Sequence, residues 1–269
     1  MRAGDRVVAA SRNRSAIAER LGPDSDFLLS VQLDVTDAEQ AEAVVGAAVR
    51  RFGGIDVLVN NAGYGHMGFF EGLTIKDAQE QFDTNLFGVF QVTWAALPFM
   101  RSARIGRIFN VSSIAGIVGS QMASLYCASK FALEGFSESL AKEVLPFGIC
   151  VTIVEPGPFR TDFLKPESLR FGGKPIAEYE DSHKEFRASM NERNGRQPGD
   201  PQKLGEAIVY LANEAKPPLH FFAGAVAVDV ADQKLAAMRA EIGTWRQLSI
   251  GTDGTYADAD VDSVRRLLK

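Results

Sequence analysis

Residues 107–130 read RIFNVSSIAGIVGSQMASLYCASK, a short apolar run that leads through a polar turn into a helical pattern. The run over Arg107–Val111 predicts a β-strand. Ser113 follows the carboxyl end of that strand, which is where open α/β sheets contact their ligands. Tyr126 and Lys130 stand four residues apart, so on a helix their side chains share one face. The stretch therefore predicts an α/β fold with a candidate site at the end of a strand.

The same alternation of strands and helices continues on both sides of this stretch. Further strands are predicted over Arg6–Ala10, Phe27–Val35, Ile55–Val59, Cys150–Val154 and Leu219–Ala223. Helices are predicted over Asp37–Phe52, from Thr74 to about Met100, over Met122–Leu145, from Asp200-Pro201 onward, and up to about Trp245. We expect Thr36 and Glu39 to form a capping box for the first of these helices, and Gly53 to end it. Alternating strands and helices indicate a parallel sheet that is covered on both faces.

One domain over residues 1–250 and a loose tail over residues 251–269 are the expected organisation. A long irregular stretch runs from Glu155 to Gly199, and we interpret residues 159–199 as a lid inserted over the substrate site, because it carries several aromatic side chains. No internal repeat marks a second domain.

Composition excludes several classes of protein. Of the 269 residues, 46% are hydrophobic and 23% are charged, which is typical of a globular chain and not of a disordered one. The net charge of −5 argues against a nucleic-acid partner. The most apolar run, Leu86–Met100, is too short to span a membrane, and no secretory signal is evident, so we expect a cytoplasmic protein. Cys127 and Cys150 are interpreted as buried, reduced thiols.

The pair of Tyr126 and Lys130 has a clear chemical use. A tyrosine with an ordinary pKa near 10 is a poor acid or base at neutral pH. An adjacent ammonium group favours the phenolate and lowers that pKa. Taken alone, however, a tyrosine and a lysine at this spacing are equally consistent with a solvated helix face.

Five elements in a fixed order resemble the short-chain dehydrogenase/reductase family. They are Asn60-Asn61-Ala62-Gly63 after one strand, Asn85 in the long helix, Ser113, the pair Tyr126 and Lys130, and Pro156-Gly157 after another strand. The resemblance covers about residues 4–230. It implies a Rossmann-like, doubly wound parallel sheet that binds a nicotinamide dinucleotide and transfers a hydride between that cofactor and a carbonyl or alcohol.

The resemblance also implies roles for individual residues. Tyr126 exchanges a proton with the substrate oxygen, Lys130 lowers the tyrosine pKa and binds the nicotinamide ribose, and Ser113 holds the substrate oxygen. Asn85 anchors a water molecule of the proton relay. The implied cofactor-binding residues are Arg12, Asp34, Val35, Asn60, Ala62, Gly63, Tyr126, Lys130, Pro156, Gly157 and Thr161.

Each of these residues also has a plainer interpretation. Ser113 is equally typical of a turn at a strand end, and Asn85 of a local helix hydrogen bond. Asp34 suits the cap of the next helix, and Pro156-Gly157 suits an ordinary turn. The combination of all five elements favours the enzyme over these alternatives.

The glycine-rich turn that follows the family's first strand is not found in this sequence. The resemblance therefore implies an N-terminally truncated domain that lacks strand one, the phosphate-binding loop and helix one. Because the first strand is central in such a sheet, we expect a gap between the strands at Arg6–Ala10 and Ile55–Val59.

A match to the dinucleotide fingerprint G-x-G-x-x-G does occur at Gly63–Gly68, with Asp83 twenty residues beyond Gly63. We reject it, because the fingerprint must open a helix directly and the next helix is capped only at Thr74. These glycines are interpreted as a turn and a flexible loop near the substrate.

The preferred cofactor is predicted from the end of the strand at Arg6–Ala10. No acidic residue follows it to bind a ribose hydroxyl, whereas Arg12 suits the 2′-phosphate of NADP. The plainer interpretation is that Arg12 and Arg14 are solvated charges at a helix start.

The leading hypothesis is an NADP(H)-dependent oxidoreductase that forms a homodimer or homotetramer through its two long helices. The alternative is a non-catalytic dinucleotide-binding or regulatory protein with a relic site, which the missing glycine-rich loop favours. We predict no metal site, because His66, His183 and His220 share no ligand spacing. His66 is interpreted as a solvated loop histidine rather than a substrate contact.

Overall fold

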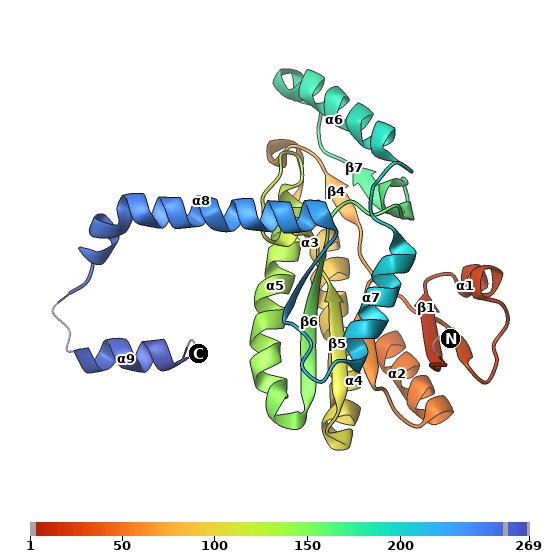
Figure 1. Ribbon diagram of the computed structural model, residues 1–269. Coiled ribbons are helices and arrows are strands. Elements are labelled where there is room, and N and C mark those ends of the chain that lie inside the picture. The colour runs from red at the N-terminus through yellow and green to blue at the C-terminus, as the bar shows by residue number, and fades with distance from the viewer. Residues whose placement is uncertain (1–3, 255–257, 268–269) are drawn as a thin grey trace. The chain divides into compact units, whose positions relative to one another are not determined.

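The computed structural model describes residues 4–254 and 258–267, and its strands pair in parallel (Figure 1). The main sheet has four strands in the order β3-β5-β6-β8. Their bounds are β3 Val57–Asn60, β5 Gly106–Val111, β6 Ile149–Pro156 and β8 His220–Ala223. Two smaller sheets pair β1 (Val7–Ser11) with β2 (Leu28–Gln32), and β4 (Gly65–Met67) with β7 (Leu169–Phe171). This architecture confirms the predicted α/β class.

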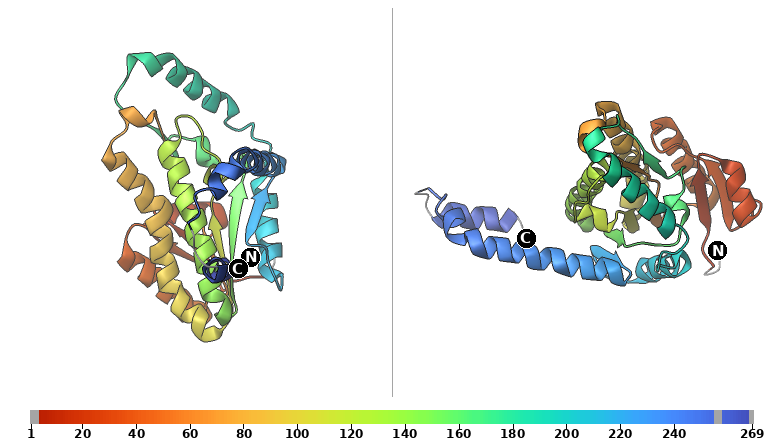
Figure 2. Two further views of the ribbon diagram at one scale, coloured as in Figure 1. Left: turned by 90° about the vertical axis from the view of Figure 1, so that its left-hand side faces the viewer. Right: turned by 90° about the horizontal axis from the view of Figure 1, so that it is seen from above.

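Helices cover both faces of the main sheet. The α-helices between residues 4 and 213 are α1 Arg14–Leu21, α2 Ala38–Phe52, α3 Ile75–Phe82, α4 Gly88–Ala103, α5 Ser124–Val144, α6 Glu180–Arg193 and α7 Pro201–Asn213. Neighbouring residues of β5 point to opposite faces: Ile108 packs with Leu140 of α5, and Phe109 packs with Leu211 of α7. Figures 1 and 2 show α5 and α7 on the two sides of β5 and β6. The sheet is therefore doubly wound, as predicted.

The expected gap between the first and third strands is present. β1 and β3 belong to separate sheets, and no strand lies between them among residues 4–254 and 258–267. On β3, the side chains of Val57 and Val59 are 42% and 43% exposed. Two apolar side chains of a core strand thus face solvent where a Rossmann sheet has a neighbouring strand.

The start of α2 differs in detail from the prediction, whereas its end agrees. The predicted capping box of Thr36 and Glu39 is wrong, because Asp37 caps α2 by accepting a hydrogen bond from the Gln40 N–H at 3.1 Å. Thr36 instead bonds the carboxylate of Asp34. Gly53 ends α2 in the left-handed conformation, as predicted.

The long helix after Thr74 has three parts. Thr74 caps α3 and forms a capping box with Asp77. A π-helical segment follows over Asp83–Phe87, and α4 continues from it without a break. π-helical turns are rare and are frequently found at functional sites, so this segment is a candidate part of a functional site.

The stretch from Glu155 to Gly199 is more regular than predicted. It contains β7 and the fourteen-residue helix α6. α6 has no buried residue, so its sequence carries no apolar stripe by which a helix is recognised. Figure 1 shows β4, β7 and α6 beyond the carboxyl ends of β5 and β6.

The chain falls into two compact units, residues 1–230 and 231–269. The division lies inside α8 (Ala225–Ile250), which extends five residues past the predicted end at Trp245. The predicted loose tail contains a helix, α9 (Asp258–Leu267), whose last turn carries Arg265 and Arg266 and so complements the helix dipole. The other residues of that tail beyond 254 lie outside the described part. Among the described helices, none has the length and apolarity needed to cross a membrane.

Candidate active site

Tyr126 lies in the first turn of α5 and is only 8% exposed. Burial raises the pKa of its phenol to about 12, and a hydrogen bond with the side chain of Ser113 opposes that rise. The Ser113 hydroxyl also accepts a hydrogen bond from the Ala115 N–H at 3.1 Å, so it serves the local turn and the tyrosine together. The phenol is thus protonated at neutral pH, which is the form that can donate a proton.

Lys130 is 5% exposed and shares the face of Tyr126, with its Nζ 5.9 Å from the centre of the tyrosine ring. The ammonium donates a hydrogen bond to the Val111 carbonyl oxygen at 2.8 Å. Burial lowers the pKa of Lys130 to about 8, while the charge of Glu134 opposes that change. The sequence led us to expect a lowered tyrosine pKa beside this lysine. The structure differs, because burial raises the pKa of Tyr126 and the hydrogen bond with Ser113 only partly opposes that rise.

Asn85 lies in the π-helical segment and is fully buried. Its Oδ1 accepts a hydrogen bond from the Tyr64 N–H at 3.0 Å. Its Nδ2 donates to the Tyr64 carbonyl oxygen at 3.0 Å and to Ser129 Oγ at 3.1 Å. Ser129 in turn donates to the Tyr126 carbonyl oxygen at 2.7 Å. Both amide N–H bonds of Asn85 are therefore used inside the protein, which leaves only its oxygen for the predicted water molecule.

Gly63 is the point at which these groups converge. A Cβ atom placed there would lie 3.2 Å from Asn85 Oδ1 and 3.7 Å from Lys130 Nζ. The backbone of Gly63 thus passes close to the ammonium, which has two N–H bonds beyond the one given to Val111. These donors fit the hydroxyl groups of a ribose.

Two further residues of the predicted cofactor site, Asn60 and Ala62, differ in burial. Asn60, at the end of β3, donates from Nδ2 to Asn110 Oδ1 at 2.8 Å and to Thr93 Oγ1 at 3.1 Å. Its side chain therefore joins β3 to β5 and α4. Ala62 is exposed.

Arg12 and Asp34 lie near each other at the ends of β1 and β2. Arg12 is exposed, and its charge contributes to lowering the pKa of Asp34, although hydrogen bonds from Thr36 lower it more. Those bonds support the plainer interpretation of Asp34 as part of the approach to α2. Val35 is half-buried against Gly88. Of this group, Arg12 is the side chain that is free to reach a ligand.

Pro156 and Gly157 follow Glu155 at the carboxyl end of β6, and the Gly157 N–H donates to the Ala223 carbonyl oxygen at 3.0 Å. Thr161 is exposed and caps a short 3₁₀ turn by accepting from the Phe163 N–H. These residues lie at the same sheet edge as Ser113, since β5 and β6 are parallel.

The lid packs directly on the candidate catalytic tyrosine. Met67 and Leu169 form a buried cluster with Tyr126 and Cys127, and the ring of Phe163 lies 5.7 Å from the tyrosine ring. Cys127 is thus a core thiol, as predicted. Cys150, by contrast, is only half-buried on β6.

His66 is not a solvated loop histidine. It is 7% exposed and lies in β4, where the backbone N–H donates to Gln81 Oε1 at 2.7 Å. The loop predicted as flexible is therefore largely a buried strand. A Cβ at Gly68 would lie 2.5 Å from the Gly172 carbonyl oxygen, so packing against β7 explains that glycine. The rejection of this stretch as a dinucleotide fingerprint is consistent with the structure, because the next α-helix starts only at Ile75.

Sequence reasoning missed two groups of buried polar residues. Ser129 connects the Asn85 side chain to the backbone of Tyr126. Its position between Tyr126 and Lys130 was the one feature of the sequence that could have predicted this role. Glu134, Glu155 and His220 come from three separate elements and lie close together only in the folded chain, so no short sequence motif predicts the cluster.

Comparison with known proteins places these observations in context. The family model of the short chain dehydrogenases matches residues 1–170. The chain is 34% identical over 251 residues to the oxidoreductase BOA17 of Botryotinia fuckeliana, which covers 93% of this chain and 90% of that protein. A short-chain dehydrogenase structure from Streptomyces avermitilis aligns with a TM-score of 0.83 at 37% identity, covering 94% of this chain and 91% of the other. The structure of ElxO with NADP bound aligns with a TM-score of 0.65 at 28% identity, covering 80% of this chain and 85% of that one.

Proposed function

The chain belongs to the short-chain dehydrogenase family, and we propose that it is an NADP(H)-dependent oxidoreductase acting on a carbonyl or secondary alcohol substrate. The observation that carries the proposal is the protonated, buried phenol of Tyr126 beside the hydroxyl of Ser113. A bound nicotinamide supplies or accepts the hydride. Because its phenol is protonated at neutral pH, Tyr126 starts as the group that gives a proton to a carbonyl oxygen, although its raised pKa makes it a weaker acid than a free tyrosine.

The roles of the chain's own groups follow from their contacts. Ser113 lies against the phenol and holds the substrate oxygen where negative charge develops. Lys130 binds the ribose with the N–H bonds that Val111 leaves free. Asn85 fixes the Tyr64 backbone and the catalytic turn of α5 at once, and its oxygen is the remaining acceptor for a relay water.

The proposed preference for NADP depends on Arg12. Its exposed guanidinium can form charge-assisted bonds to a 2′-phosphate. Binding of NADP by ElxO supports the same cofactor here. We expect Arg12→Ala to weaken NADPH binding about tenfold, or ~1.4 kcal/mol, and to leave NADH binding unchanged. Arg14→Ala is the matched control, because Arg14 is paired with Asp24 at 2.9 Å. Equal losses for both cofactors would contradict the proposed role of Arg12.

The lid indicates an apolar substrate of medium size. Phe163, Leu164 and Phe171 pack around the buried cluster that contains Tyr126. Apolar walls with a few polar groups are typical of sites for small organic ligands. The Ser113 hydroxyl and the phenol are the polar groups that would orient a single oxygen of such a substrate.

We also propose a homodimer or homotetramer. Large apolar side chains on the outside of the two long helices support it, including Trp94 at 68% exposure and Phe131 at 44%. Exposed apolar surface of this kind is typical of interfaces. The molar mass in solution, measured by light scattering, tests this proposal, and a monomer at micromolar concentration would contradict it.

The proposed activity is tested by Tyr126→Phe, with Tyr210→Phe on exposed α7 as the matched control. Turnover with a panel of apolar ketones should fall by ~10²–10⁴-fold in the first variant and remain unchanged in the second. NADPH binding should survive in both. Retention of wild-type turnover by Tyr126→Phe would refute the assignment. A wild-type protein that binds NADPH but reduces no ketone would favour the non-catalytic alternative.

A further inference from the structure

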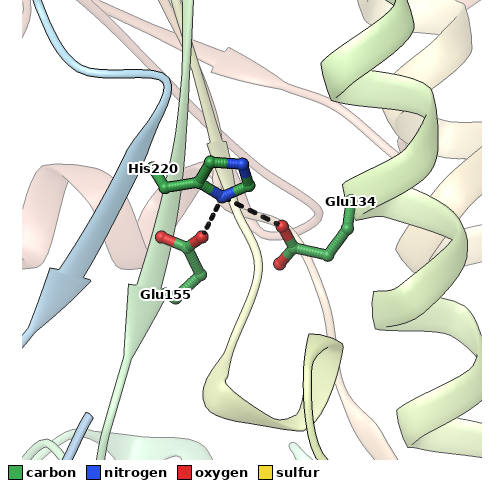
Figure 3. Close-up of side chains that lie close together, drawn as sticks. All are labelled: Glu134, Glu155 and His220. Atoms are coloured by element: carbon green, nitrogen blue, oxygen red, sulfur yellow. Dashed lines mark hydrogen bonds and ion pairs between the residues drawn. The ribbon is translucent and has the colours of Figure 1, made fainter. Parts of the chain in front are cut away.

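A second cluster of ionisable side chains lies behind the catalytic turn. Glu134 of α5, Glu155 of β6 and His220 of β8 point toward one another (Figure 3). His220 Nδ1 is 2.7 Å from Glu155 Oε1 and 3.8 Å from Glu134 Oε2. One ligand atom from each residue lies within 4.8 Å of the others. The proposed hydride transfer uses none of these groups.

Glu134 has no adequate partner where it is buried. It is 6% exposed, and neither of its carboxylate oxygens has a hydrogen bond. The neighbouring Ser112 Oγ is equally buried; it interacts with Glu134 but lacks the geometry of a hydrogen bond. Because a buried carboxylate is costly unless it is paired or coordinates a metal, such oxygens indicate a missing ligand.

The charges in the cluster do not balance. Glu155 is fully buried, and Glu138 Oε1 lies 3.8 Å from His220 Nε2. Three carboxylates therefore face at most two cationic groups, the His220 imidazole and, beside Glu134, the buried Lys130 ammonium.

We propose that Glu134, Glu155 and His220 form a binding site for a divalent transition-metal cation of the Zn²⁺ class. One imidazole nitrogen and two carboxylate oxygens are a ligand set that zinc uses, with a water molecule in the fourth position. At metal–ligand distances near 2.1 Å, tetrahedral ligand atoms lie about 3.4 Å apart. The observed separations of 2.7 and 3.8 Å bracket that value, so small side-chain rotations suffice.

The surroundings hold the proposed ligands in orientation. Glu155 Oε2 accepts a hydrogen bond from the Phe221 N–H at 2.9 Å, which leaves Oε1 for the cation. Glu138 lies on the Nε2 side of His220, where a carboxylate commonly accepts the outer N–H of a metal-binding histidine. The imidazole is 35% exposed, which gives a cation a way in from solvent. The site would join β8 to β6 and to α5, one helical turn beyond Lys130.

Metal uptake by the intact protein tests this proposal directly. The full chain is stripped with a chelator and titrated with Co²⁺, which reports coordination by visible absorption, and zinc content is then measured by mass spectrometry. We expect about one equivalent per chain, and a rise of about 5 °C in the thermal midpoint at a hundredfold excess of Zn²⁺ over its dissociation constant.

Variants separate the site from adventitious binding. Glu134→Gln should weaken uptake by at least ~100-fold, and the exposed Glu143→Gln on the same helix should have no effect. His220→Asn changes a half-exposed side chain and gives a second test if Glu134→Gln fails to fold. Uptake below a tenth of an equivalent by the wild type, or equal uptake by His220→Asn, would overturn the proposal. Neither readout depends on enzyme activity.

Discussion

The hydrogen bonds of Asn85 predict a measurable loss of stability in Asn85→Ala. The Tyr64 N–H would lose its partner in a fully buried position, at a cost of about 1–3 kcal/mol. The Tyr64 carbonyl keeps its bond from Gln81, and Ser129 keeps its bond to the Tyr126 carbonyl, so each of these two losses costs about 0.5–1 kcal/mol. The sum is about 3 kcal/mol, which for a chain of this size lowers the thermal midpoint by about 6–12 °C.

Thermal unfolding followed by circular dichroism measures this loss. Asn61→Ala is the matched control, because Asn61 is exposed in the loop just before Gly63. We expect its midpoint to stay within about 2 °C of the wild type. If Asn85→Ala also stays within that range, the buried network does not hold the π-helical segment against the catalytic turn, and the reasoning is refuted.

Three further predictions concern the active site. Ser113→Ala removes the group that opposes the raised pKa of Tyr126, so turnover should fall ~100-fold and the alkaline limb of its pH profile should move upward; an unmoved limb would exclude this contact. Gly63→Ala places a Cβ 3.7 Å from Lys130 Nζ and should weaken NADPH binding about tenfold by titration, whereas Gly54→Ala, with open space around it, should not. The pKa of Lys130 falls from 10.5 to about 8 on folding, so the unfolded chain binds more protons between these values and this residue makes stability rise with pH there. Lys130→Met should remove that part of the slope in urea unfolding at pH 8–10, and identical slopes would contradict the burial of a titrating lysine.

Most of the fold was predictable because its signals are local. Each strand of the main sheet is a short apolar run, and the Asp200-Pro201 pair marks the start of α7 by capping and fixed backbone geometry. The gap between β1 and β3 also followed from the order of motifs. α6 and α9 were missed because both are strongly polar, and α6 places only Phe186 and Met190 against the core.

The candidate site was predictable to the extent that its residues lie within short motifs. The shared face of Tyr126 and Lys130 follows from helical spacing alone. The direction of the tyrosine pKa did not follow, because burial depends on Met67 of β4 and Leu169 of β7, which lie outside the motif. The cluster at His220 was invisible for a related reason: its ligands come from three elements that only the folded chain brings together.

The π-helical segment over Asp83–Phe87 has a consequence for which sequence changes the chain can accept. A π turn holds one residue more than an α turn, and each residue of an α-helix adds about 100° of rotation. Because the wide turn absorbs that extra residue, removing one residue from this segment would restore a regular helix and leave the later residues facing nearly the same way. Val92, Ala96 and Met100 of α4 would then keep their packing in the core. The same deletion would displace Asn85 from its bonds to Tyr64 and Ser129, so a change of length here should harm the candidate active site more than the core.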